Sequence, residues 1–318
     1  MIKHILITGV SGFVGAALAQ TLIEENVQLT CLTRVPLKMD GVNFVAIEDI
    51  NSSVICATLL QGIDTVIHCA ARAHVMKELS PDPLAEYRRV NVDATMQLAR
   101  AAADAGVKRF IFLSSVKVNG EATLPGKPWS EENIPHPHDA YGISKWEAEQ
   151  GLQELAATSS LEIVIIRLPL VYGAGVKANF LSMLTKVQRG LPLPLAAVRN
   201  KRSFVYLGNL ISLIVRCIDH PNAANQVFFV SDDADLSTSE LLRHCARAFG
   251  KKSRLFSVPV RGLRLGAALM GKRAVSQRLL GSLQVDINKA KTLLDWAPPY
   301  SVDEGLKLTV QALLQEQK

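Results

Sequence analysis

The chain has 318 residues, of which 48% are hydrophobic, with 35 Lys and Arg against 29 Asp and Glu. This composition is too apolar for a disordered protein, and at about 150 residues per domain the length predicts roughly two lobes. The net charge of +6 is modest. Because the basic residues do not run together as they do in nucleic-acid-binding arms, the composition favours a small anionic ligand over nucleic acid.

The five cysteines form an odd set without CxxC or Cys/His ligand spacing. This pattern argues against a disulfide framework and a structural metal, and it predicts a reducing, cytoplasmic location. The charge-free run at residues 5–23 has the length of a targeting or membrane segment, but three glycines interrupt it and divide it into a strand-like and a helix-like half. We therefore expect neither a bound metal nor membrane insertion.

The first half of the chain alternates short β-branched runs with longer helical patterns, as parallel sheets with crossover helices do. This order predicts a doubly wound, Rossmann-like α/β fold. The expected strands are Ile5–Thr8, Gln28–Thr33, Asn43–Ile47, Thr65–His68, Phe110–Ser114 and Ile163–Arg167, and the expected helices are Val14–Glu25, Ser53–Gln61, Leu84–Ala105 and Tyr141–Ala157.

The strict alternation stops after residue 168, where prolines and glycines cluster differently, so a smaller C-terminal lobe is expected from this point. Two later runs, Phe204–Leu207 and Gln226–Val230, look like strands that return to the main sheet. The expected division is therefore discontinuous. The main domain covers 1–168 with a return at 204–232, and the smaller lobe covers 169–203 and 233–318.

Gly9, Gly12 and Gly15 lie between the first expected strand and the first expected helix. Without a Cβ, these positions let backbone N–H groups and the helix N-terminus approach a pyrophosphate. The GxxGxxG spacing matches the common GxGxxG fingerprint only in part. The strand–turn–helix context predicts a dinucleotide site in the main domain, to which Phe13 and Val14 at the start of the helix also contribute.

The end of the second strand predicts which dinucleotide is bound. An acid there accepts hydrogen bonds from the adenosine ribose, whereas a basic residue favours a 2′-phosphate. The strand ends at Arg34 without an acid, which favours NADP, with NAD as the alternative if Arg34 is an ordinary solvated residue. Asp49 and Ile50 follow the third strand and are candidates to bracket the adenine, although a loop acid and a core residue explain them equally well.

Tyr141 and Lys145 are four residues apart, so on a helix they share one face. An ammonium beside a phenol stabilises phenolate and lowers the tyrosine pKa from about 10, as a proton donor or acceptor requires. Ser114 and Ser115 end the preceding strand, on the side where parallel sheets bind ligands. A hydroxyl there is placed to hydrogen-bond both the phenol and a substrate carbonyl.

The dinucleotide turn, the strand-end serine and the YxxxK pair together resemble the extended short-chain dehydrogenase/reductase family, over most of the chain. Further resemblance lies in the HCAA stretch at 68–71, in Asn91 within RVNV, and in RLPLVYG at 167–173. The first of these segments comes at the end of the fourth expected strand, Asn91 lies on the next expected helix, and the third segment begins at the end of the sixth expected strand.

The resemblance implies a catalytic triad of Ser115, Tyr141 and Lys145. It also implies that Lys145 holds the nicotinamide ribose, that Asn91 helps to place Lys145 through a water, and that Ala70 and Ala71 line the cofactor. As in relatives, the helices at 84–105 and 141–157 are candidates for a homodimer seam, although covering the sheet explains their apolar stripes equally well.

The downstream segments resemble the sugar-nucleotide branch of the same family. Asn179 stands where an asparagine contacts the substrate diphosphate, and Arg202 stands where an arginine engages the nucleotide. A guanidinium fork matches phosphate geometry. A turn residue and a solvated basic cluster are the alternative explanations. Arg278 is a candidate for a second phosphate contact, and a UDP-sugar is the expected substrate.

Departures from the family patterns narrow the reaction. Val116 and Lys117 stand where sugar-nucleotide 4,6-dehydratases carry an Asp-Glu pair, and valine supplies neither an acid nor a base for elimination. Asn119 stands where epimerases often have tyrosine. A hydride reaction at C4 of the sugar remains, performed either by a reductase or by an epimerase.

Arg34 and the SSVKVNGE stretch at 114–121 favour an NADP-dependent reductase of a UDP-4-keto-6-deoxy-N-acetylhexosamine. Its product, for example UDP-N-acetylquinovosamine, would serve surface polysaccharide synthesis. The alternative is an NAD-dependent UDP-sugar 4-epimerase, which returns the same hydride and needs no net reductant. A third hypothesis is a catalytically silent, cofactor-sensing protein.

Overall fold

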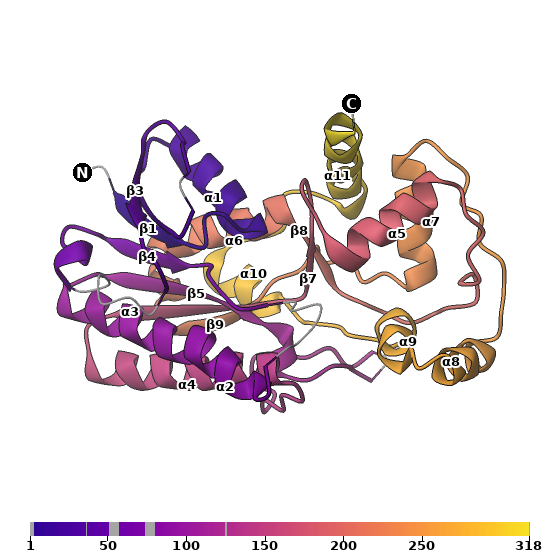
Figure 1. The fold of residues 1–318 in the computed structure, drawn as a ribbon, viewed down its shortest axis with the longest axis horizontal. Coiled ribbons are helices and arrows are strands. Elements are labelled where there is room, and N and C mark those ends of the chain that lie inside the picture. The colour runs from indigo at the N-terminus through magenta and orange to yellow at the C-terminus, as the bar shows by residue number, and fades with distance from the viewer. Residues whose placement is uncertain (1–2, 36, 51–56, 74–79, 125, 318) are drawn as a thin grey trace.

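The structure is a computed structural model that describes residues 3–35, 37–50, 57–73, 80–124 and 126–317. Within these residues a seven-stranded parallel sheet has the order β3-β2-β1-β4-β5-β6-β9 (Figure 1). The order reverses after β1, which is the doubly wound arrangement. The strands are β1 (His4–Thr8), β2 (Gln28–Thr33), β3 (Val42–Ala46), β4 (Thr65–His68), β5 (Arg109–Ser115), β6 (Glu162–Leu168) and β9 (Gln226–Phe229).

Both faces of the sheet are covered, because every residue of β4 and β5 is buried. Such strands are near-continuous apolar runs, as parallel sheets require. One core cluster lies on the side of α1 and α6, and a second lies on the side of α3 and α4. The covering helices are α1 (Phe13–Glu24), α3 (Ala94–Asp104), α4 (Ala140–Thr158), α6 (Leu207–Asp219) and α10 (Asn288–Leu294).

The six expected strands are confirmed to within one residue at each end. The expected helix at 84–105 is divided into α2 (Pro83–Arg88), a π-helical turn at Arg89–Asp93 and α3. Of the helix expected at 53–61, residues 53–56 lie outside the described residues, and Ala57–Leu60 is a 3₁₀ turn. The helix around the tyrosine and lysine is confirmed as α4.

The expectation that Phe204–Leu207 returns to the main sheet is wrong. Residues Phe204–Tyr206 form β8, which pairs with β7 (Leu170–Tyr172) in a separate two-stranded parallel sheet. Pro169 lies between β6 and β7 and has no backbone N–H to donate, so the chain leaves the main ladder there and β7 offers β8 a new edge. The return of Gln226–Val230 is confirmed by β9, which pairs with β6.

A third core cluster lies under helices that stand apart from the main sheet (Figure 1). These helices are α5 (Ala178–Gln188), α7 (Thr238–Ala248) and α11 (Val302–Glu316). Two further helices, α8 (Val260–Leu269) and α9 (Arg273–Leu280), pack on each other at the end of the molecule away from α1 and α3. None of the helices in the described part of the chain meets the length and hydropathy that a bilayer span requires.

Candidate active site

The glycine turn between β1 and α1 tolerates no side chain at two of its positions. Gly9 has φ +73, and a Cβ there would lie 2.6 Å from the backbone nitrogen of Ala70. A Cβ on Gly15 would lie 2.3 Å from the carbonyl oxygen of Gly9. Gly12 is the N-cap of α1 and has no side chain to cap the first N–H groups. The helix therefore begins with free donors, as a pyrophosphate site requires.

The end of β4 is joined to this turn by a buried histidine. His68 Nδ1 lies 2.8 Å from Thr8 Oγ1, and His68 Nε2 lies 3.0 Å from Thr95 Oγ1. The Ala70 N–H donates to the same Thr8 hydroxyl at 3.2 Å. Burial, together with the nearby charge of Lys145, lowers the pKa of His68 to about 3. His68 is therefore neutral and fixes the loop that carries Ala70 beside the glycine turn.

Lys145, on α4, is buried although it carries an ammonium group. Its Nζ lies 3.9 Å from the ring centroid of Phe112, on β5. Burial lowers the pKa of Lys145 to about 7, and the charges of Glu149 and Cys69 act in the opposite direction. Phe112 pairs with His68, the last residue of β4, so the ammonium lies near the carboxyl end of that strand.

Tyr141 lies one helical turn before Lys145 and is hydrogen-bonded to Ser115. The expected lowering of the phenol pKa by Lys145 is not observed. Burial raises the pKa of Tyr141 to about 12, and the hydrogen bond from Ser115 only partly offsets the burial. The reason is that the ammonium lies over Phe112 rather than against the phenol. The structure nevertheless brings Ser115 and Tyr141 together, as the sequence predicts.

Asn91 lies in the π-helical turn, a feature that often occurs at functional sites. Its amide donates to Ser144 Oγ at 3.0 Å and to the carbonyl of Arg72 at 3.1 Å, and its Oδ1 accepts from the Arg72 N–H at 2.8 Å. Asn91 thus connects the loop after β4 to the residue that precedes Lys145. A water-mediated role towards Lys145 stays a prediction.

A buried ionic network lies behind the catalytic candidates, and sequence reasoning missed it. Glu149, one turn after Lys145, is fully buried and accepts hydrogen bonds from Ser114 and Arg167. Arg167 also donates to Asn119 Oδ1 at 3.0 Å. The sequence contains one indication of this network: Glu149 follows Lys145 by four residues, so it lies on the same helix face as the YxxxK pair, one turn further on. Asn119, the departure from the epimerase pattern, therefore has a structural partner.

The residues that were expected to decide between the two dinucleotides lie around the ends of β2 and β3. Arg34 is exposed. Asp49 forms an ion pair with Arg89 at 3.1 Å, and Ile50 packs in part against the second core cluster. These contacts fix Asp49 and Ile50 at the carboxyl edge of the sheet, and their roles towards an adenine stay predictions.

The expected substrate residues include two cations that lie near each other. Arg202 is half-buried, and its guanidinium donates to the carbonyl of Gly281 at 3.2 Å. Burial and the charge of Arg278 lower the pKa of Arg202 to about 10. In the described part of the chain no carboxylate forms an ion pair with either arginine. Asn179 is exposed in the first turn of α5, directly after Ala178, which has φ +54.

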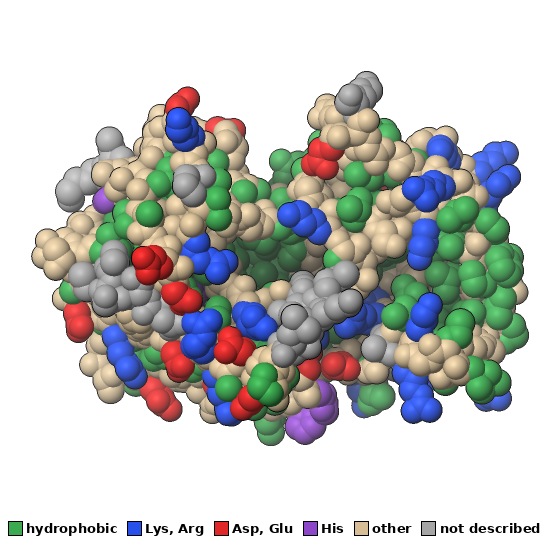
Figure 2. Space-filling view, viewed as in Figure 1, with side chains coloured by type: hydrophobic (Ala, Val, Ile, Leu, Met, Phe, Trp, Pro, Cys, Tyr) green, Lys and Arg blue, Asp and Glu red, His purple; other side chains and the backbone are tan. Residues whose placement is uncertain are grey.

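The surface is hollowed between the sheet and the lobe of α5 and α7 (Figure 2). A cavity of about 540 Å³ lies where the loop after β5 faces α9. Its lining includes Asn119 of that loop and Gln277, the neighbour of Arg278. The cavity therefore adjoins the buried network through Asn119.

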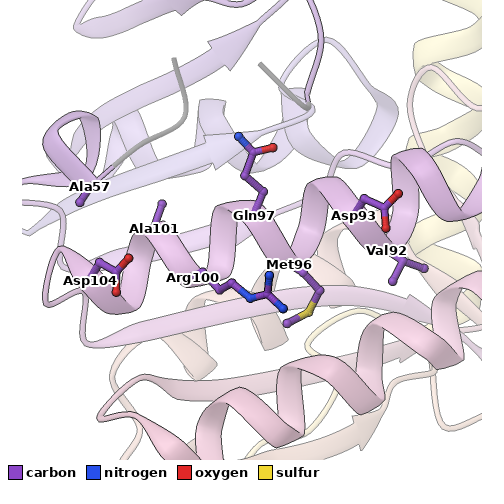
Figure 3. A pocket seen from close by; sticks show the side chains of 8 residues that line it. All are labelled: Ala57, Val92, Asp93, Met96, Gln97, Arg100, Ala101 and Asp104. Atoms are coloured by element: carbon purple, nitrogen blue, oxygen red, sulfur yellow. The ribbon is translucent and has the colours of Figure 1, made fainter. Parts of the chain in front are cut away.

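A groove of about 600 Å³ lies elsewhere, along α3 (Figure 3). Met96 and Arg100 extend from α3 on the side of α4, and Gln97 extends to the other side. The groove holds none of the catalytic candidates. It runs along a helix that was expected to form a homodimer seam, which stays a prediction. Its lining is Ala57, Val92, Asp93, Met96, Gln97, Arg100, Ala101 and Asp104.

Comparison with known proteins identifies the family of this chain. Residues 5–230 match the sequence profile of the NAD dependent epimerase/dehydratase family. A curated relative, the UDP-glucose 4-epimerase of Vibrio cholerae, is 49% identical, and the alignment covers 99% of this chain and 97% of the relative. The chain belongs to the NAD dependent epimerase/dehydratase family.

Two more distant proteins are also similar to this chain. The N-acetyl-alpha-D-glucosaminyl-diphospho-ditrans,octacis-undecaprenol 4-epimerase of Escherichia coli O157:H7 is 29% identical, over 98% of this chain and 95% of the relative. The solved structure of MoeE5 in complex with UDP-glucose and NAD is 24% identical, covers 99% of this chain and 100% of its own, and superimposes with a TM-score of 0.79. The latter likeness establishes the fold.

Proposed function

We propose that this protein is an NAD-dependent UDP-sugar 4-epimerase. The observation that carries the proposal is the placement of Tyr141, hydrogen-bonded to Ser115, beside a buried Lys145 at the edge of the glycine turn. The 49% identical V. cholerae relative favours epimerisation over the reduction that the sequence led us to expect. The keto-sugar reductase hypothesis has no comparable support, and the epimerase alternative replaces it.

The described residues fit a dinucleotide. A Cβ on Gly9 or Gly15 would fill the cradle, and the N-terminus of α1 presents uncapped donors. Gly9, Gly12 and Gly15 would hold the pyrophosphate, and Lys145 would hold the nicotinamide ribose. When bound, NAD supplies a reversible acceptor for the hydride at C4. We propose NAD rather than NADP, because the exposed Arg34 has the properties of a solvated residue.

The proton at the sugar O4 is handled by the chain itself. Tyr141 Oη accepts it as the C4 hydroxyl becomes a ketone and gives it back after the sugar has turned over. The single O–H of Ser115 donates either to the phenolate or to the sugar O4, so it stabilises negative charge on whichever oxygen carries it. Accepting this proton requires the phenolate, and because burial raises the pKa of Tyr141 to about 12, the positive charge that bound NAD would bring must first lower that pKa.

Arg202 and Arg278 are the proposed contacts of the substrate diphosphate. Their mutual repulsion and the burial of Arg202 both favour an anion between them, because the anion would relieve the cost of holding two cations together. Asn179 is proposed to contribute at the start of α5. A cytoplasmic location and a role in surface polysaccharide synthesis remain hypotheses that accompany this function.

The test is to identify the bound nucleotide and the reaction together. The purified protein is denatured and the released nucleotide is identified by mass. The native protein is then incubated with UDP-glucose and UDP-N-acetylglucosamine, and the products are resolved by NMR. Tightly held NAD and interconversion of C4 epimers without a net absorbance change support the proposal. Oxidation of added NADPH by a UDP-4-keto-6-deoxy sugar, without epimerisation, would restore the reductase.

A lipid-linked diphospho-sugar is a second candidate substrate, because the E. coli relative acts at C4 of such a molecule. The same assay distinguishes the two when it is repeated with N-acetylglucosaminyl-diphospho-undecaprenol. Turnover of this lipid in the absence of any turnover of UDP-sugars would assign the second candidate.

A further inference from the structure

The basic charge of the chain is concentrated in one segment. Ten Lys and Arg and no Asp or Glu lie between Glu240 and Asp286. The net charge of the entire chain is +6, so the remainder of the molecule is net acidic. The basic residues are spaced along the segment, which hides the concentration when only consecutive charges are sought.

The same segment exposes large apolar side chains. Leu269 is 81% exposed, Met270 65% and Leu265 64%. The helix that carries them, α8, has no buried residue among those described and packs on α9. Exposed leucines on a helix without a covering layer are uncommon on the surface of a free monomer. The exposed apolar side chains and the basic residues of this segment therefore indicate a partner that binds both kinds of group.

Basic and apolar groups share one row of α8. Arg261, Leu265 and Leu269 follow one another at intervals of four residues, so they lie along one side of the helix. Figure 2 shows hydrophobic side chains with Lys and Arg around them at the end of the molecule that carries α7 and α8. We define the α8 surface as Arg261, Arg264, Leu265, Leu269, Met270 and Lys272.

We propose that the α8 surface docks on an anionic lipid membrane. An interfacial helix of this kind inserts its apolar side chains at the headgroup level while its basic residues remain with the lipid phosphates. A second copy of this chain is disfavoured, because two surfaces of the same positive sign would face each other. Nucleic acid is disfavoured as well, because it has no apolar layer to receive the leucines.

Docking in this way would also orient the substrate lobe. The next helix, α9, carries Arg278, whose charge acts on Arg202. A molecule held by α8 would therefore keep these two arginines near the lipid surface. The docking proposal itself depends only on α8 and does not depend on which reaction the enzyme performs.

The experiment measures co-sedimentation of the full chain with vesicles of phosphatidylcholine, alone or mixed with phosphatidylglycerol. We expect binding only to the mixed vesicles, weakened by added salt. The Leu265→Gln, Leu269→Gln double variant should lose the apolar contribution, which is roughly tenfold or more in partitioning for each leucine. The Arg261→Gln, Arg264→Gln double variant should lose about fivefold for each charge. The matched control is Leu308→Gln, which changes an equally helical, exposed leucine on α11.

Three outcomes would overturn the proposal. One is equal partitioning of wild type to neutral and mixed vesicles, or none to either. Another is binding to duplex DNA that exceeds vesicle binding and survives the leucine substitutions. The third is a concentration-dependent dimer, seen by sedimentation velocity, that the leucine substitutions dissociate. Because all four substituted side chains are on the surface, far-ultraviolet circular dichroism is expected to be the same for every variant and serves as the folding check.

Discussion

Tyr141 and Lys145 have different neighbours in the structure, although the sequence predicted that the ammonium acts directly on the phenol. The spacing of four predicts one helix face and is confirmed, but the phenol is hydrogen-bonded to Ser115 whereas the ammonium lies over Phe112. Burial raises the pKa of the phenol and lowers that of the ammonium. Which side chain a buried cation contacts depends on packing from β5, and a spacing motif carries no information about it.

Tyr141→Phe should lower turnover by about 10²–10⁴-fold, because only the group that exchanges the O4 proton is removed. NAD binding should stay within a few-fold of wild type, since no cofactor contact is lost. Steady-state kinetics and calorimetric NAD titration measure both quantities. Tyr87→Phe is the matched control, because its ring lies 6.0 Å from that of Tyr141. Near-normal turnover of the Tyr141 variant would show that another group moves the proton.

Lys145 should make the stability of the cofactor-free protein depend on pH. An unfolded lysine titrates near 10.4, whereas the folded pKa is lowered to about 7. Between these values the unfolded state holds a proton that the folded state lacks, so the free energy of unfolding rises with pH by about 1.4 kcal/mol per unit. Below about 7 the cost of burying the charge is fully present.

Lys145→Met should lack this rise. The measurement is urea unfolding of both proteins at several pH values from neutral to mildly alkaline. Parallel curves for wild type and variant would mean that Lys145 keeps its proton when folded.

At the scale of elements, most of the main sheet could be predicted from sequence, because buried parallel strands are continuous apolar runs between turn signals. The π-helical turn around Asn91 could not, since the apolar period continues through it. The pairing of β8 with β7 could not be predicted either. It depends on Pro169 and on which strand edge is free, and the sequence of a short strand does not indicate its partner. The Glu149–Arg167 ion pair could not be predicted, because it depends on how α4 and β6 lie next to each other.

Gly15→Ala should disrupt the turn between β1 and α1, because the new Cβ would lie 2.3 Å from the backbone oxygen of Gly9. We expect NAD affinity to fall by more than about tenfold, since the N–H donors would be displaced. Gly266→Ala is the control, as it also lies in a helix but its Cβ meets open space. That substitution should be neutral or stabilise by up to about 1 kcal/mol. Unchanged NAD affinity in the Gly15 variant would remove the turn from the cofactor site.

Glu149→Gln should destabilise the protein by about 3–5 kcal/mol, because it leaves the buried Arg167 guanidinium without its carboxylate. Glu147→Gln, two residues earlier, breaks a more exposed pair with Arg88 and should cost less than about 1 kcal/mol. Chemical unfolding compares the two variants directly. Equal effects would mean that the Asn119 oxygen, to which Arg167 already donates, is sufficient for this guanidinium without the carboxylate.

At the scale of the molecule, the catalytic candidates lie on the main sheet and its helices, whereas the paired arginines belong to the smaller lobe. The sequence predicted the catalytic candidates and Arg202 from motifs, whereas Arg278 was a candidate by its position alone. It did not predict that Arg202 and Arg278 lie near each other, since 75 residues that include two strands and several helices separate them. The concentration of positive charge around α8 was not predicted either, because the basic residues between Glu240 and Asp286 are spread along the segment and do not form a single run.

The most direct measurement uses UDP-glucose labelled with deuterium at C4. If Tyr141 moves only the O4 proton while the hydride leaves and returns within one active site, UDP-galactose should form with the deuterium still at C4 and no free reduced nucleotide should appear. Loss of the label to water or to exchangeable nucleotide, or the absence of any C4 epimer from all sugar nucleotides tried, would contradict the account.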